Sequence, residues 1–144
     1  MFSSKIVYGS FFLLSLSGCA SVECVKKTTE EVLPGTSTAL VGLYIDRNGY
    51  PQASVETVVV APGQRIIFVG PEKFDIIFKN EKSPVEQFKL SARDGVLILD
   101  IPRDVFAQED KDDRTNIGKD EISYKYGIKA NGKETDPEIK VRPR

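Results

Sequence analysis

The stretch that decides the fold runs from Ser54 to Asn80 and reads SVETVVVAPGQRIIFVGPEKFDIIFKN. It contains three short apolar runs separated by proline–glycine pairs: Val55–Val60, Ile66–Val69 and Phe74–Phe78. Short runs that are rich in β-branched and aromatic residues and bounded by proline and glycine are typical of β-strands. Because the runs are almost continuously apolar, they also predict strands shielded on both faces, as in the middle of a sandwich.

Further strands are predicted on both sides of this stretch. Ile122–Ile128 alternates strictly between apolar and polar residues, which is the period of a half-buried strand. Two Asn-Gly pairs, at 48–49 and 131–132, predict tight turns, since both residue types tolerate a positive φ. The first turn also resembles the start of a calcium loop, but the later ligands do not follow, which favours a turn. The other predicted strands are Thr38–Ile45, Phe88–Ala92 with Phe88, Leu90 and Ala92 on one face, Val96–Ile101, and Ile139–Val141.

The longest stretch without periodicity is Arg103–Glu121, and it contains the acidic segment Glu109–Asp113. Five acids within a dozen residues could hold calcium, but they lack the alternate spacing with a glycine that a calcium loop needs, which favours a solvated loop. No helix is predicted after residue 18. About seven or eight strands with regularly spaced turns predict an all-β fold, a Greek-key β-sandwich.

Composition limits the possible functions. The 144 residues suffice for one domain with a core. The net charge of −1 gives no basic field for binding nucleic acid. The chain contains no histidine, so it lacks the most common general base and the most common transition-metal ligand. Its two cysteines, Cys19 and Cys24, both lie near the N-terminus, so neither fits a disulfide framework or a zinc motif in the fold.

The N-terminal residues have the three parts of an export signal. Lys5 supplies a positive charge, Ile6–Leu16 supplies a short apolar segment, and small residues follow. The segment ends in Leu16-Ser17-Gly18-Cys19, which resembles the bacterial lipobox. The resemblance implies that residues 1–18 form a cleaved lipoprotein signal peptide. It also implies that Cys19 is lipidated, with a diacylglycerol on its thiol and a fatty acid such as palmitate on its amino group; a soluble secretory leader is the alternative.

Residues 19–35 are polar and predict a tether, with a short strand near Val32, and residues 36–144 form the predicted domain. Ala20 and Ser21 follow the anchor, and the absence of aspartate there indicates the outer membrane, facing the periplasm. Cys24 is either a free thiol, a thiol paired with another chain, or a covalent link to a partner lipoprotein.

Three segments resemble the cupredoxin family. Ala61–Phe68 matches the Pro/Ala-Gly-x-x-Ile/Val-x-Phe strand of cupredoxins, Phe74–Phe78 resembles the strand that carries the first histidine ligand, and Ser123–Ile128 resembles the final Tyr-x-Tyr strand. The resemblance covers roughly residues 55–141 and implies a cupredoxin-like sandwich. It places Phe74 and Asn131 at the histidine positions and Ile128 at the cysteine position.

The chain departs from the family at every copper ligand. A phenyl ring, a hydrocarbon and a neutral amide cannot hold copper, so we expect no copper and no other cofactor. Carboxylates are scattered and no catalytic motif is present, so we expect no enzyme activity. These features predict a lipid-anchored binding or structural module of the bacterial cell envelope, with the membrane and an envelope protein as partners. The alternative is a protein that captures a small ligand or a metal ion through the acidic segment 109–113.

Overall fold

The computed structural model describes residues 29–31, 37–112 and 120–143, which form eleven strands and one helix. The helix α1 spans Val105–Asp112. The strands, in chain order, are β1 (Thr29–Glu31), β2 (Thr38–Ile45), β3 (Pro51–Ala53), β4 (Thr57–Val60), β5 (Arg65–Val69), β6 (Asp75–Phe78), β7 (Lys89–Ser91), β8 (Val96–Asp100), β9 (Ile122–Ala130), β10 (Lys133–Thr135) and β11 (Glu138–Val141).

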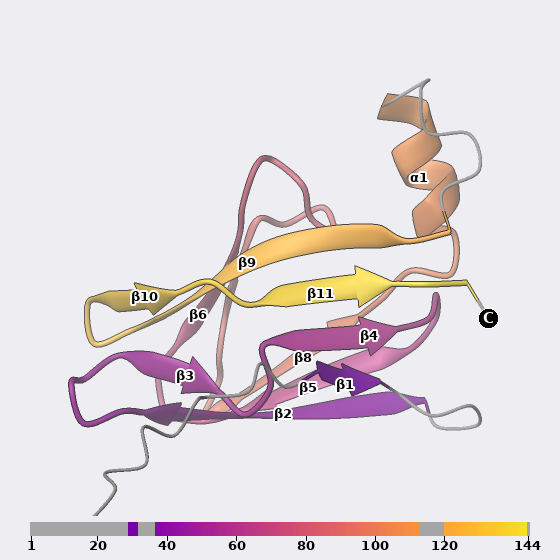
Figure 1. The fold of residues 1–144 in the computed structure, drawn as a ribbon. Coiled ribbons are helices and arrows are strands. Elements are labelled where there is room, and N and C mark those ends of the chain that lie inside the picture. The colour runs from indigo at the N-terminus through magenta and orange to yellow at the C-terminus, as the bar shows by residue number, and fades with distance from the viewer. Residues whose placement is uncertain (1–28, 32–36, 113–119, 144) are drawn as a thin grey trace, which may run out of the picture.

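The strands form two mixed sheets that lie one above the other (Figure 1). The larger sheet has the order β1-β4-β11-β9-β6-β7, with β10 added to β9, and the smaller has the order β3-β2-β5-β8. Several neighbours are distant in sequence and parallel, including β2 with β5 and β4 with β11. The predicted all-β sandwich is confirmed. The strand expected near Val32 lies slightly earlier, where β1 pairs with β4 inside the predicted tether.

The first Asn-Gly turn is confirmed and joins β2 to β3. Gly49 has a φ of 81°, and the Asp46 carboxylate accepts hydrogen bonds from the backbone N–H groups of Asn48 and Tyr50 at 2.9 and 2.8 Å. The bond from Tyr50 contributes most to lowering the pKa of Asp46. The carboxylate therefore caps the turn by accepting these backbone donors. The second turn is also confirmed, with Asn131 and Gly132 both at positive φ.

The expectation that the apolar runs are shielded on both faces is wrong for most of them. Only Val58–Val60 in β4 is buried throughout. In β5 and β8 burial alternates, and Val69, Val96 and Ile98 are exposed. The reason is that β5 and β8 lie in an outer layer, of which only one face packs against the other sheet.

Two further expectations are corrected. Residues 105–112 are helical, so the segment 109–113 is not simply a loop, and Asp113 lies outside the described residues. Asp104, a residue type favoured at helix N-termini, precedes α1, and its carboxylate accepts a hydrogen bond from the side-chain amide of Gln108 at 3.0 Å. Val105 is buried and anchors this helix to the core.

Phe88 precedes β7 and is 48% exposed, whereas Leu90 and Ala92 pack against the core as expected.

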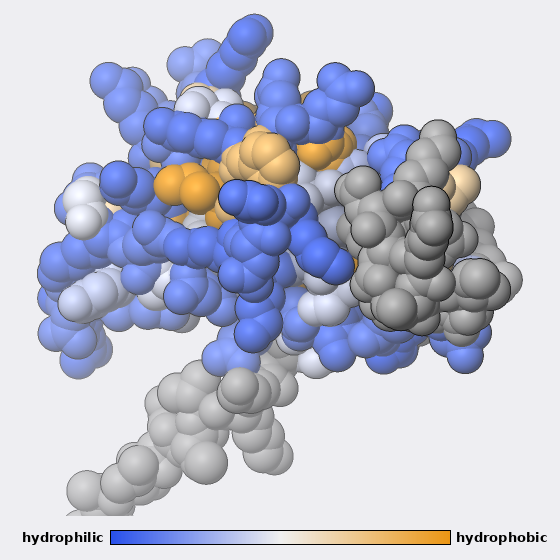
Figure 2. Space-filling view, turned by 90° about the horizontal axis from the view of Figure 1, so that it is seen from above, coloured by the Kyte–Doolittle hydropathy of each residue, from blue (hydrophilic) through white to orange (hydrophobic). Residues whose placement is uncertain are grey.

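The outer face of the larger sheet is polar. Along β9 the outward positions include Ser123, Lys125 and Lys129, all exposed. Seen from the side of β9 and β11, the surface is predominantly hydrophilic, with apolar residues gathered in one area (Figure 2). This face therefore has the ordinary character of a solvated sheet surface.

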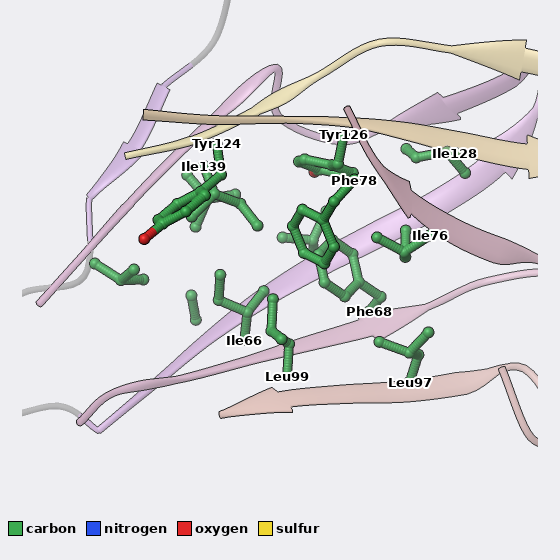
Figure 3. Close-up of a cluster of buried hydrophobic side chains, with 14 of the residues drawn as sticks. Ile66, Phe68, Ile76, Phe78, Leu97, Leu99, Tyr124, Tyr126, Ile128 and Ile139 are labelled. Atoms are coloured by element: carbon green, nitrogen blue, oxygen red, sulfur yellow. The ribbon is translucent and has the colours of Figure 1, made fainter. Parts of the chain in front are cut away.

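The core lies between the two sheets, where side chains from opposite layers point toward one another (Figure 3). Strand β9 contributes most regularly, because its predicted alternation places every second side chain inward. Phe68 of β5 meets Tyr126 of β9 edge to face, with ring centroids 5.7 Å apart. The fully buried large side chains include Phe68, Ile66, Ile76, Leu99, Tyr124, Tyr126, Ile128 and Ile139.

From the buried hydroxyl of Tyr126 we predict that Tyr126→Phe stabilises the protein. It is buried without a hydrogen-bond partner among the described residues, and burial raises the pKa of this phenol, so it stays protonated. An unpaired buried hydroxyl costs roughly 1–3 kcal/mol. We expect Tyr126→Phe to increase the free energy of unfolding by about 1 kcal/mol in urea denaturation. Tyr124→Phe is the control on the same face of β9, and it should give no such gain, because Tyr124 has an interaction partner. Destabilisation by Tyr126→Phe would contradict this prediction.

Candidate functional site

The outer face of the smaller sheet is apolar, unlike that of the larger sheet. Leu40 is 59% exposed and Ile98 is 52% exposed. We call the apolar face the group of large outward side chains on β2, β5 and β8: Leu40, Tyr44, Ile67, Val69, Val96 and Ile98. Contiguous apolar surface of this kind marks an interaction site more often than isolated exposed residues do.

The strand register arranges five of these six side chains in two rows across the sheet, and Tyr44 lies beyond the second row on β2. The first row holds Leu40, Ile67 and Ile98, which are consecutive partners on β2, β5 and β8. The second row holds Gly42, Val69 and Val96, which are partners in the same way. No charged side chain belongs to either row.

A polar rim closes the apolar face beyond the first row. There the register brings Arg65 opposite Asp100, and the guanidinium binds the carboxylate through Nε to Oδ1 at 2.6 Å and Nη2 to Oδ2 at 3.2 Å. The hydrogen bond with Asp100 is the main cause of the raised pKa of Arg65. Both side chains are exposed, so the pair contributes little to stability. An apolar centre with a polar rim is the usual anatomy of a protein interface.

Gly42 leaves a notch in the second row. A Cβ atom at this position would meet only the Ser54 side chain, at 3.7 Å, which is an ordinary van der Waals contact. The backbone of Gly42 has no positive φ, so the fold does not demand glycine here. The absence of a side chain therefore shapes the surface rather than the backbone.

A hollow of about 570 Å³ lies beside β8, the edge strand of the smaller sheet. It is bounded by β8, by the segment 84–87, by Leu90 of β7 and by Gln108 of α1. Ile98 belongs both to this hollow and to the apolar face. Exposed apolar surface thus continues around the edge of the sheet.

The positions that the cupredoxin resemblance assigned to copper ligands lie close to one end of β6 and β9. Phe74 and Ile128 are buried in the core, and Ile128 pairs with Ile76. Phe74 and Asn131 line one hollow of about 510 Å³, whereas Ile128 does not line it. The structure thus brings two of the three residues together, in a hollow that is also lined by Lys73, Asp75, Ser91 and Lys129.

A third hollow, of about 610 Å³, is lined by charged residues of both signs, among them Lys79, Lys125, Asp136 and Glu138. Lys79 forms ion pairs with Glu134 and with Asp136, the latter at 3.5 Å. The hydrogen bond with Glu134 is the main cause of the raised pKa of Lys79. These ion pairs join Lys79, which follows β6, to Glu134 in β10 and to Asp136 just after it, and they have the character of a structural contact.

Within the described residues, no group of three or more histidine, cysteine, aspartate or glutamate side chains is placed to hold a metal ion. Cys19 and Cys24 lie outside the described residues, so their predicted roles remain predictions. Among the described segments, no helix has the length and apolarity needed to cross a bilayer.

Sequence reasoning did not identify the apolar face. Leu40, Val69 and Ile98 each lie inside a run whose neighbours are apolar too, so residue type does not say which side chains point outward. The signal that could have revealed the apolar face was the two-layer architecture of the predicted sandwich. One layer of packing can cover only one face of each sheet, so some apolar residues in these runs had to remain exposed.

No protein-family model matches the sequence, and no curated protein matches it. Among solved structures, the chain is similar to a copper-containing nitrite reductase from Thermus scotoductus SA-01, with a TM-score of 0.49 and 11% sequence identity over 81% of this chain and 28% of that chain. It is also similar to a copper binding protein solved by NMR in the apo form, with a TM-score of 0.40 and 12% identity over 81% of this chain and 99% of that chain.

Proposed function

We propose that this chain is a lipid-anchored binding module of the bacterial cell envelope, which acts through protein contacts rather than catalysis or electron transfer. The observation that carries the proposal is the apolar face, defined by six large outward side chains and closed by the Arg65–Asp100 pair. Burial of such a surface is the main favourable term in most protein associations.

The absence of histidine supports binding over chemistry. With no imidazole and with both cysteines before residue 25, the domain lacks the thiolate and imidazole ligands of a blue-copper site. Two carboxylates of the charged hollow lie in ion pairs, Asp136 with Lys79 at 3.5 Å and Glu138 with Lys140 at 3.9 Å. We therefore infer that the domain acts through its surface and not through a buried cleft.

The proposed anchor would keep this surface near the membrane. Thr29, where β1 begins, lies ten positions after Cys19. A chain of that length spans at most about 36 Å when fully extended. The domain would therefore search a thin layer above the bilayer, which we propose is the periplasmic side of the outer membrane.

The anchor is tested by replacing its cysteine. We expect Cys19→Ala to abolish incorporation of labelled palmitate, to retain residues 1–18, and to change partitioning into detergent, because the acylated thiol and the cleavage site are lost together. Metabolic labelling and mass spectrometry of the N-terminal peptide measure these changes. Cys24→Ser is the matched control and should leave labelling and cleavage unchanged. Label that persists in Cys19→Ala would contradict the proposed anchor.

A further inference from the structure

We propose that the apolar face binds the same face of a second copy of this chain, in a two-fold arrangement that seats Leu40 of each copy in the notch at Gly42 of the other. This inference rests on the binding role proposed above and names the partner. It is carried by the strand register, by the exposure of the side chains and by the shape of the notch.

The two rows of the apolar face are complementary to each other. A two-fold axis can lie in the interface plane, perpendicular to the strands and midway between the rows. Rotation about it places the first row of one copy over the second row of the other and keeps β8 over β8. Leu40 then lies over the partner's Gly42, Ile67 over the partner's Val69, and Ile98 over the partner's Val96.

Each of these pairings matches a larger side chain with a smaller one. Leucine meets a position without a side chain, and both isoleucines meet valine. Interdigitation of large and small side chains is how two sheet faces pack about 10 Å apart. Because one surface carries both members of every pair, it satisfies the requirement of a two-fold interface that the same patch serve both subunits.

Charge also permits this contact. The two rows contain no charged residue, so no charge is buried when they meet, and the Arg65–Asp100 pair lies outside them with its own charges matched. The larger sheet, by contrast, presents charged residues of both signs on its outer face, with Lys125 opposite Glu138 and Lys129 opposite Asp75, so a contact through it would bury charge. The smaller sheet is therefore the face that favours self-association.

The size of the face predicts a weak dimer. A patch of this kind exposes a few hundred Å², whereas a stable interface uses about 800 Å² from each partner. The population of the dimer should thus depend on concentration. Confinement of both copies to one membrane through the proposed anchor would raise their effective concentration and favour association.

Cysteine cross-linking in the full lipidated chain tests the arrangement. Two differently tagged copies, one with Ile98→Cys and one with Val96→Cys, are expressed together with Cys24→Ser in both, and membranes are mildly oxidised. We expect a disulfide-linked heterodimer, because the two positions face each other across the interface. The control pair carries Lys125→Cys on the larger sheet and should give little product. Equal yields from both pairs, or no product from the first, would overturn the proposal.

Exchanging the residues at positions 40 and 42 tests whether Leu40 of one copy fits the notch at Gly42 of the other. Gly42→Leu should weaken association about tenfold, since two leucines would then collide. The double variant Leu40→Gly with Gly42→Leu moves the large side chain to position 42 and the notch to position 40. It should therefore restore cross-linking between positions 98 and 96. Circular dichroism confirms that both variants fold. Failure of the double variant to recover while it remains folded would overturn the proposed geometry.

The readouts separate this inference from the proposed anchor. Cross-linking is measured in the membrane fraction and in the soluble fraction. A chain found outside the membrane would contradict the proposed anchor. The proposed dimer is judged separately, by the yield of the cross-linked product in the fraction that contains the chain. A cross-link from Ile98→Cys to a different protein, in place of the second copy, would overturn the dimer and leave the binding role standing.

Discussion

Replacing Phe68 by alanine is expected to lower the free energy of unfolding by about 3–5 kcal/mol. Phe68 is fully buried in β5, and its ring meets Tyr126 edge to face across the two sheets (Figure 3). Truncation removes the apolar surface that folding buries and leaves a cavity that the two strands cannot close. Urea denaturation measures the change.

Phe88→Ala is the matched control for this substitution. Phe88 is the same residue type but is 48% exposed, ahead of β7. We expect it to change stability by less than about 0.5 kcal/mol, as surface substitutions usually do. Similar losses from Phe68→Ala and Phe88→Ala would mean that the core does not lie between β5 and β9.

Gly95→Ala is expected to cost about 2–5 kcal/mol, from backbone strain and crowding together. Gly95 has a φ of 77°, and a Cβ atom there would lie 2.7 Å from the carbonyl oxygen of Gly70. The two glycines also pair directly, since the Gly70 N–H donates to the Gly95 carbonyl at 2.9 Å. The substitution would therefore force apart the ends of β5 and β8, and thermal or urea unfolding measures the loss.

Gly132→Ala isolates the contribution of the crowding. Gly132 has a nearly identical φ of 74°, but a Cβ atom there meets nothing within 4 Å. Only the cost of a left-handed alanine remains, about 1–2 kcal/mol. A loss at Gly95 no larger than that at Gly132 would show that the approach of Gly70 is not tight.

The Gly70–Gly95 contact also bears on the proposed interface. It follows Val69 and precedes Val96, which lie side by side in the second row of the apolar face. A shift of the strand ends would displace that row relative to the first. We therefore expect substitutions at Gly95 to be unsuitable as probes of association, whereas Gly42 can be changed with the backbone intact.

The sequence by itself determined most of the strands and both Asn-Gly turns of this protein, although about seven or eight strands were expected where the structure has eleven, and β10 was not predicted. Alternation in β9 and the Asn-Gly turns depend on the conformational preferences of a few neighbouring residues, so they can be read locally. The expectation that the domain holds no copper likewise rests on residue type. The lipid anchor at Cys19 is a prediction of the same local kind and awaits its test.

The limits of local reasoning appear at α1. The segment Arg103–Glu121 shows no clear periodicity, and α1 has only one apolar turn at its start, where Val105 is buried and Phe106 packs against the core. Most of the stability of a short helix comes from such packing rather than from intrinsic propensity. The helix was therefore decided by the surface on which Val105 rests, which no local pattern specifies.

Only the tertiary structure decided which side of each apolar run is covered. In β9 the outward positions are polar, so the residue types themselves show which face is buried. In β5 and β8 both faces are largely apolar, and their exposure depends on pairing between strands far apart in the chain and on a single opposing sheet. Burial is a property of the neighbours in space, and for that reason the apolar face became visible only when β2, β5 and β8 were placed side by side.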